Sequence, residues 1–173
     1  MKYFTLGIHQ DYTPPRLTKW HGILDPKTLN EKKRNLIPKY TIFQVEHHMQ
    51  TVFTDLIFHP CFMVSETMMW TMKLYEPSFR FERIVLADQE AKKVGTYYIP
   101  RLEKLDVLTS NSRLGRDKRS LEHIEIDGEK TKGKAIFQIE HDGKMTILIH
   151  VNLAESLLRR KVIGIDLKEV DVI

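Results

Sequence analysis

The chain has 173 residues, a formal net charge of +4 and 42% hydrophobic residues, which is typical of a globular protein with one domain or two small lobes. It contains no run of about 18 apolar residues, which excludes a transmembrane helix, and its N-terminus turns polar too early for a signal peptide. The single cysteine, Cys61, leaves no internal disulfide. We therefore expect a cytoplasmic protein.

The N-terminal part predicts one strand followed by irregular structure. Lys2–Ile8 is apolar enough for a strand. The segment from about 9 to 39 is rich in proline and turn formers, which disfavour regular elements. Within it, Thr28 and Glu31 have the spacing of a capping box and predict a short helix. Trp20 is the expected anchor of this segment on the body of the protein.

Two elements are expected before the middle of the chain. Tyr40–Val45 alternates and predicts a short strand. In Gln50–Phe58 the apolar residues have the spacing of one helical face, and His59-Pro60 would end that helix because a residue before proline avoids helical space. The apolar residues concerned are Val52, Phe53, Leu56 and Ile57.

A strand–helix–strand unit is predicted from Cys61 onwards. Cys61–Val64 is a short apolar run of the kind found in buried strands, and Ser65 is a suitable N-cap for a helix that Pro77 ends. Phe79–Leu86 predicts the return strand, and Asp88 starts a polar turn region that runs to Gly95. Met68, Met69, Met72 and Tyr75 lie on one face of that helix.

Short elements are expected between the two units. Thr96–Ile99 and Leu105–Leu108 are candidates, Ser110–Ser120 is a polar loop, and Leu121–Ile126 alternates. Glu129–Lys134 is charged and expected to be exposed. The stretch Ala135–Val151, interrupted by His141-Asp142-Gly143, predicts a β-hairpin.

A second strand–helix–strand unit ends the chain. Asn152, with Glu155 three residues later, predicts the helix N-cap, so Asn152→Ala should destabilise the protein by about 1 kcal/mol. Ala154, Leu157 and Leu158 are expected to face inward, and alternation predicts a half-buried strand over 163–168. The two units repeat a pattern rather than a sequence, and both helices are expected to pack on one sheet.

The expected fold class is therefore α+β, with a mainly antiparallel sheet and two strand–helix–strand units that pack their helices on one face. We expect a single domain over residues 1–173, with the irregular N-terminal segment wrapped on the body.

Several residues are candidates for a catalytic or metal-binding site. Histidine and cysteine at 47, 48, 59 and 61 are types that bind zinc, but their spacing lacks the paired pattern of structural zinc sites. Ser65 follows a strand and precedes a helix, as a hydrolase nucleophile does, but the glycines of that motif are missing. We predict no catalytic residue, cofactor or metal, and keep a hydrolase or metal enzyme as an alternative.

Three groups are candidates for contacting a partner. Methionines 63, 68, 69 and 72 are expected to be core, whereas Trp70 and Leu74 lie on the flank of that helix and are better contact residues. A basic patch of Arg113, Arg116, Lys118 and Arg119 is a second candidate; it has no interleaved aromatic residues, so a nucleic-acid-associated module using residues 113–119 is only an alternative. An acidic group, Asp166, Glu169 and Asp171, is the third.

An ordered set of segments spans nearly the whole chain and resembles a known family. The segments are Pro14–Trp20, TDLIFHPCFMVSETM (Thr54–Met68), FRFERIVLAD (Phe79–Asp88), GTYYIPRLEKLDVLTSNS (Gly95–Ser112), KAIFQIEHDGKMTILIHVNLAESL (Lys134–Leu157) and VIGIDLKEV (Val162–Val170). Together they resemble an uncharacterised family of small bacterial proteins grouped with the immunity proteins of polymorphic toxin systems. The lysine-rich region from Thr28 to Tyr40 does not match.

The resemblance implies a non-enzymatic α+β protein that binds and neutralises a cognate protein toxin, without a cofactor and without a membrane. The expected partner contacts are Trp70, Leu74, Arg113, Arg116, Arg119, Asp166 and Glu169. Many toxins are basic nucleases with acidic inhibitors, and the mild positive charge of this chain does not fit that case well.

Overall fold

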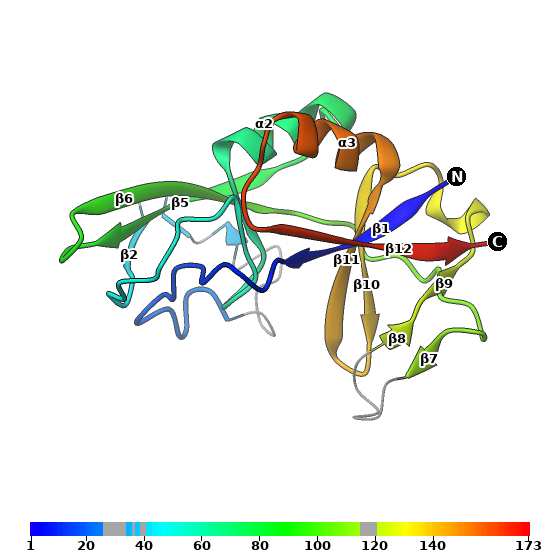
Figure 1. The fold of residues 1–173 in the computed structure, drawn as a ribbon, viewed down its shortest axis with the longest axis horizontal. Coiled ribbons are helices and arrows are strands. Elements are labelled where there is room, and N and C mark those ends of the chain that lie inside the picture. Colours follow the sequence, from blue (N-terminus) through cyan, green and yellow to red (C-terminus); the bar gives the residue numbers. More distant parts are fainter. Residues whose placement is uncertain (26–33, 36, 39–40, 115–120) are drawn as a thin grey trace.

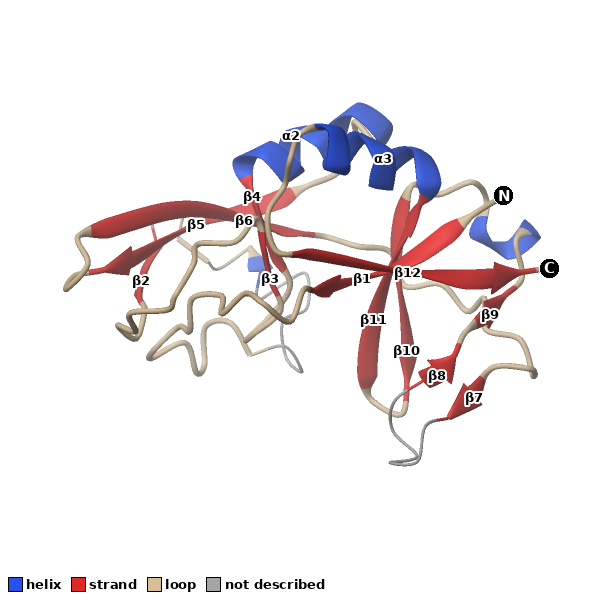
Figure 2. Cartoon of the chain, viewed as in Figure 1, coloured by secondary structure: helices blue, strands red, loops and turns tan. Residues whose placement is uncertain are grey.

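The computed structural model describes residues 1–25, 34–35, 37–38, 41–114 and 121–173 (Figure 1). These described residues form two five-stranded sheets, a two-stranded sheet and two α-helices, α2 and α3, with more residues in strands than in helices (Figure 2). The α+β class expected from the sequence is confirmed. The short helix predicted from Thr28 lies outside the described residues.

The first sheet joins the two ends of the chain. Its pairs are antiparallel except for the parallel pair of its last two strands. The strand order is β10 (Ile136–His141), β11 (Lys144–His150), β1 (Tyr3–Ile8), β12 (Ile165–Val172) and β9 (Glu125–Ile126). The predicted first strand and the hairpin β10–β11 are therefore confirmed.

The second sheet is built from the middle of the chain. Its strand order is β2 (Thr41–Gln44), β5 (Phe81–Asp88), β6 (Lys93–Pro100), β4 (Met63–Ser65) and β3 (Leu56–Ile57). Only β2 and β5 run parallel. A separate two-stranded sheet pairs β7 (Arg113–Leu114) with β8 (Leu121–His123).

The helices lie side by side above the junction of the two sheets (Figure 1). Helix α2 (Glu66–Tyr75) follows β4 of the second sheet, and α3 (Val151–Arg159) follows β11 of the first. The expectation that both helices pack on one sheet is therefore wrong, because each helix packs on the sheet that contains its own preceding strand. Their buried faces share one apolar cluster, which also includes Leu6, Val64, Ile147 and Ile149.

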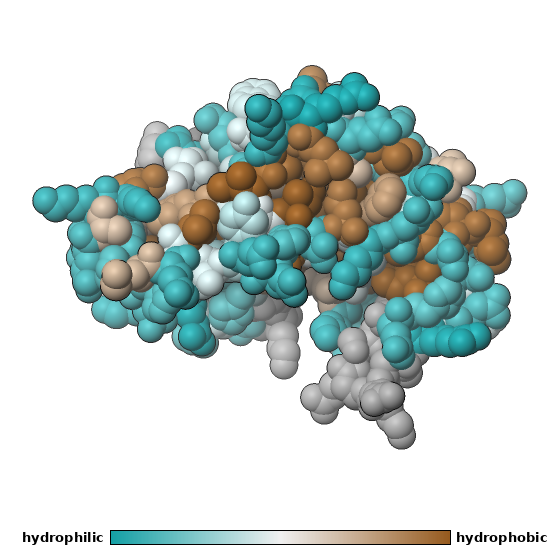
Figure 3. All heavy atoms as spheres, viewed as in Figure 1, coloured by the Kyte–Doolittle hydropathy of each residue, from teal (hydrophilic) through white to brown (hydrophobic). Residues whose placement is uncertain are grey.

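Two further apolar clusters fill the other face of each sheet. Under the second sheet, Leu17 and Leu24 of the N-terminal segment are buried with Phe43, Ile84 and Leu86, and Trp20 packs against them. Under the first sheet, Tyr3 and Phe137 belong to the third cluster. Figure 3 shows one face of the molecule, on which hydrophobic residues gather below the helices and hydrophilic residues cover the outer side of the helices.

The helix predicted over Gln50–Phe58 is not present. The segment is a loop that ends in the two-residue strand β3, where Leu56 pairs with Val64 and Ile57 with Met63. Leu56 belongs to the cluster under the helices and Ile57 to the cluster on the other face of the sheet. A strand that is apolar on both faces produces adjacent buried residues, which in the sequence resemble a helical face.

The N-cap predicted at Asn152 is also wrong. Helix α3 starts two residues earlier than predicted, at Val151, and its N-cap is His150, whose Nδ1 accepts a hydrogen bond from the Asn152 N–H at 3.2 Å. Leu153 is buried in the cluster, whereas Leu158, expected to face inward, is 53% exposed. The N-cap predicted at Ser65 is confirmed, because its hydroxyl accepts a hydrogen bond from the Met68 N–H at 3.3 Å.

The region between the two units differs from the prediction in four places. The hairpin β5–β6 extends through Asp88 and Lys93, so the polar turn is shorter than expected. The polar loop contains β7, and 105–108 is not a strand but is attached by isolated bridges at Lys104 and Leu108. The segment 129–134 is mostly exposed as expected, but Thr131 within it is fully buried, and its hydroxyl accepts a hydrogen bond from Tyr3 Oη at 3.1 Å.

Asp55 connects the two halves of the molecule. Its carboxylate accepts hydrogen bonds from the Ser65 hydroxyl and, at 2.7 Å, from the Ile163 N–H just before β12. Its own N–H donates to the Ile163 carbonyl at 3.0 Å. The start of α2 and the start of β12 are thereby held to the same residue. Neither helix in the described part of the chain has the length and apolar character needed to cross a membrane.

Candidate partner-binding face

Helix α2 exposes two large apolar side chains on its outer side. The inward positions Met68, Met69 and Met72 are buried, which confirms the prediction that the methionines are core. Trp70 and Leu74 are one helical turn apart and are 58% and 67% exposed. An exposed tryptophan next to an exposed leucine is a common feature of protein interfaces, where tryptophan frequently dominates the binding energy.

A groove of about 580 Å³ lies beside Trp70, between α2, the start of β5 and β6. Three aromatic rings line it with Trp70, namely Phe79, Phe81 and Tyr98. Its charged side chains are four cations and one carboxylate: Lys73, Arg80, Arg83, Arg101 and Glu82. We call this the basic groove, and we call the basic groove together with Trp70 and Leu74 the α2 face.

The alternation of β5 separates the groove from the core. Ile84 and Leu86 are buried below the sheet with Glu82, whereas Phe81 and Arg83 lie on the upper, more exposed side. Arg83 is directly opposite Tyr98 on β6, and cross-strand partners project to the same face. One strand therefore supplies both a buried layer and the floor of the groove.

The rings in the groove pack on one another. The centroid of Phe81 lies 6.1 Å from that of Phe79 and 6.5 Å from that of Tyr98, both edge to face. The Lys73 ammonium lies 5.3 Å from the ring centre of Trp70 and 5.8 Å from that of Phe81. These contacts fix the rings, so the groove is held in shape before any partner binds.

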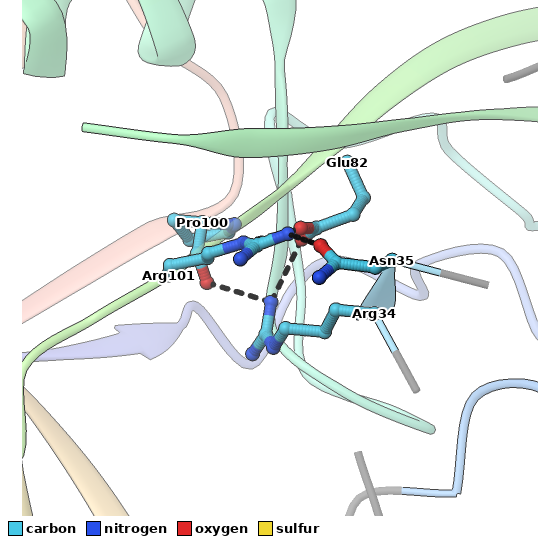
Figure 4. A network of polar contacts seen from close by, with 5 residues as sticks. All are labelled: Arg34, Asn35, Glu82, Pro100 and Arg101. Carbon is cyan, nitrogen blue, oxygen red and sulfur yellow. Dashed lines mark hydrogen bonds and ion pairs between the residues drawn. The ribbon is translucent and has the colours of Figure 1, made fainter. Parts of the chain in front are cut away.

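Glu82 is the buried acid beneath the groove and is held by two arginines (Figure 4). It is 9% exposed; Arg34 Nη1 donates to one of its oxygens at 2.9 Å and Arg101 Nε to the other at 2.5 Å. Arg34 also donates to the Pro100 carbonyl at 3.3 Å, and Arg101 Nη2 to Asn35 Oδ1 at 2.8 Å. The network attaches residues 34–35 to the ends of β5 and β6.

Two cations of the groove are exposed and remain available. Arg80 and Arg83 make no side-chain hydrogen bond or ion pair with any residue in the described part of the chain. The Arg80 carbonyl accepts a hydrogen bond from the Arg101 N–H at 3.0 Å, which sets the backbone of Arg80 next to the Glu82 network. The groove thus presents two exposed guanidinium groups that have no partner among the described residues, on a backbone held by the Arg80–Arg101 hydrogen bond and by strand β5.

The other predicted contact residues lie away from the α2 face. Arg113 is exposed at the start of β7, which Figure 1 places far from α2, and Arg116 and Arg119 lie outside the described residues. Asp166 and Glu169 are both on β12 but have opposite parity, so they project to opposite faces of the first sheet. Glu169 pairs with Lys2 at 2.8 Å, and Asp166 lies 3.9 Å from Lys168. Of the candidates that the structure describes, Trp70 and Leu74 lie together on α2, and Glu169 and Asp171, two residues apart on β12, line a separate pocket.

The predicted metal or catalytic candidates have structural partners. His47 Nδ1 lies 3.0 Å from Asp88, and that hydrogen bond raises the pKa of His47. The Cys61 thiol is buried, which raises its pKa to about 12. Ser65 donates to Asp55 and caps α2. Among the described residues, no group of three or more histidine, cysteine, aspartate or glutamate side chains is arranged to hold a metal ion.

The basic groove was not predicted from the sequence, because its cations come from separate places: helix α2, the residue before β5, β5 itself and the residue after β6. One feature does point to it. In β5 a glutamate occupies a buried position in line with Ile84 and Leu86, and a buried carboxylate requires a cationic partner.

Comparison with known proteins gives no relative on which to base an assignment: no protein-family model matches the chain, and no curated protein matches it.

Proposed function

We propose that this protein is a non-enzymatic binding module of the toxin-immunity type, which neutralises a cognate protein toxin by binding it through the α2 face. The sequence resemblance supports the class of partner. The observation that carries the choice of surface is Trp70, a tryptophan 58% exposed at the edge of a preformed groove. Tryptophans in such positions are typical centres of protein interfaces.

The arrangement suits the tight binding of another protein. Leu74 extends the apolar area along α2, and the basic groove surrounds it with charge that can align a partner. Helix α2 is anchored by the Ser65 cap and by its buried methionines. Little conformational entropy is then lost at the α2 face on binding, because its backbone is already ordered.

The test is a protection assay with the toxin encoded beside this gene, combined with a direct measurement of Kd. The double variant Trp70→Ala/Leu74→Ala should weaken binding at least about tenfold and reduce protection, since truncating interface tryptophans typically costs more than 1 kcal/mol. Leu158→Ala is the matched control, because Leu158 is a leucine of comparable exposure on α3. Equal effects of the two changes, or no binding by the wild-type chain, would contradict the proposal.

A further inference from the structure

We propose that the basic groove receives an acidic segment of the protein partner, with its carboxylates paired to Arg80 and Arg83 and an apolar side chain next to Trp70. This inference rests on the proposed function and adds the chemistry of the partner. It is opposite in charge to the common pairing of a basic toxin with an acidic inhibitor.

The positive charge of the groove indicates that the bound segment of the partner is negatively charged. Four cations line it against one carboxylate, and that carboxylate, Glu82, is already held by Arg34 and Arg101. Arg80 and Arg83 have no such partner among the described residues and are exposed. A guanidinium binds a carboxylate through two parallel hydrogen bonds, which gives a planar, directional contact.

Because the cations lie beside aromatic rings, the contact with the partner combines charge pairing with apolar packing. Arg83 is opposite Tyr98, and Phe81, two residues earlier on the same face, packs against Tyr98. A segment that pairs with Arg83 therefore lies over aromatic carbon, close to Trp70 across the groove. The volume of about 580 Å³ holds a few side chains rather than a folded element.

The packing of the rings favours an acidic peptide over a nucleic acid. Binding of a single strand relies on bases stacked on open aromatic faces. Here the Lys73 ammonium lies over Trp70 and Phe81, and Phe79 and Tyr98 meet Phe81 edge to face. The rings form a fixed apolar wall instead of a set of stacking platforms.

The experiment uses Trp70 as a local reporter. The chain has two tryptophans, and Trp20→Phe leaves Trp70 as the only one. This variant is titrated with an octapeptide in which glutamates alternate with leucine and phenylalanine, with the corresponding lysine peptide, and with an oligothymidine of eight nucleotides. Where Trp20→Phe does not fold, calorimetric titration of the wild-type chain replaces fluorescence.

The expected result is a saturable change in fluorescence with the acidic peptide only. Its affinity should fall at least about tenfold in Arg80→Ala/Arg83→Ala and should decrease with salt, as expected for screened charge pairs. Lys168→Ala, which removes an exposed cation on β12, should leave it unchanged. No saturable change with the acidic peptide, an equal affinity in the double variant, or preferential binding of the oligothymidine would overturn the proposal.

The same variants separate this inference from the proposed function. A toxin that is bound and neutralised equally well by Arg80→Ala/Arg83→Ala would refute the acidic contact and leave the immunity role standing. Specific binding of the acidic peptide by a chain that protects against no toxin would refute the immunity role and leave the chemistry of the groove standing.

Discussion

At the scale of single residues, two carboxylates of strand β5, Glu82 and Asp88, have different cationic partners. Glu82 is enclosed between two arginines beneath the basic groove, and Asp88 lies at the far end of the same strand with His47. Both occupy the buried face of β5. Each therefore depends on its cationic partner, but only the His47 pair can lose its charge near neutral pH.

Glu82→Gln should lower the free energy of unfolding by about 3 kcal/mol, because it removes the buried negative charge to which Arg34 and Arg101 both donate. Glu140→Gln is the control, since Glu140 pairs with the exposed Lys104 and such pairs contribute less than about 1 kcal/mol. Urea denaturation of both variants measures the difference. Similar losses would show that Glu82 is not held as a buried ion pair.

His47 should make stability depend on pH. The hydrogen bond with Asp88 raises the pKa of His47 above 6.5, so its contribution is complete below that pH and is lost as pH rises through the folded-state pKa. The hydrogen bond from the Ala91 N–H is the largest cause that lowers the pKa of Asp88, and the hydrogen bond with His47 is the second. The contribution of Asp88 to stability is therefore lost as pH falls through this lowered pKa.

His47→Gln should therefore lower Tm more at about pH 5.5 than at about pH 8.5, on either side of the ordinary histidine pKa. Thermal unfolding followed by circular dichroism measures this difference. In an Asp88→Asn background the pH dependence of the His47→Gln effect should disappear. If it persists, another group is responsible.

At the scale of elements, the two helices begin with different caps. Ser65→Ala should destabilise the protein by about 1 kcal/mol, because it removes the acceptor of the Met68 N–H and also a hydrogen bond to Asp55. Asn152→Ala should have a much smaller effect, because the side chain that caps α3 belongs to His150. Chemical denaturation of the two variants side by side distinguishes the caps, and a larger loss in Asn152→Ala would contradict the assignment.

The elements that could be predicted are those whose pattern is local. The hairpin of β10 and β11 has a turn at Asp142-Gly143 between apolar runs, and α2 has both its cap and its stop within the sequence. The prediction of a helix over Gln50–Phe58 failed because β3 is buried on both faces, which depends on its pairing with β4. The prediction of the α3 cap failed because histidine is an uncommon N-cap, and the asparagine two residues later is a better match to the pattern.

The candidate site was predictable only in part. Trp70 and Leu74 follow from the helical spacing of α2, since they fall outside its apolar stripe. The groove next to them depends on the pairing of β5 with β6 and on Arg34, which is 48 residues from Glu82 in the sequence. Contacts of that sequence separation leave no local pattern beyond the buried glutamate itself.

At the scale of the whole molecule, the two sheets depend on one shared layer of apolar residues beneath the helices. Leu157→Ala at this layer should cost about 3 kcal/mol, since Leu157 is fully buried where α3 meets residues of both sheets. Hydrogen exchange should show reduced protection in β1 and β11 and also in β5 and β6. Loss confined to the first sheet would mean that the two halves unfold independently.

The alternation along β5 also has a consequence for how such a protein changes over generations. The side chains below the strand maintain the fold, and those above it, with Trp70 across the groove, meet the outside. Arg80, Arg83 and Trp70 are exposed, so replacing them removes no side chain from the buried layer that holds the fold. If the α2 face is the binding surface proposed above, its specificity could therefore change through a few substitutions at small cost in stability.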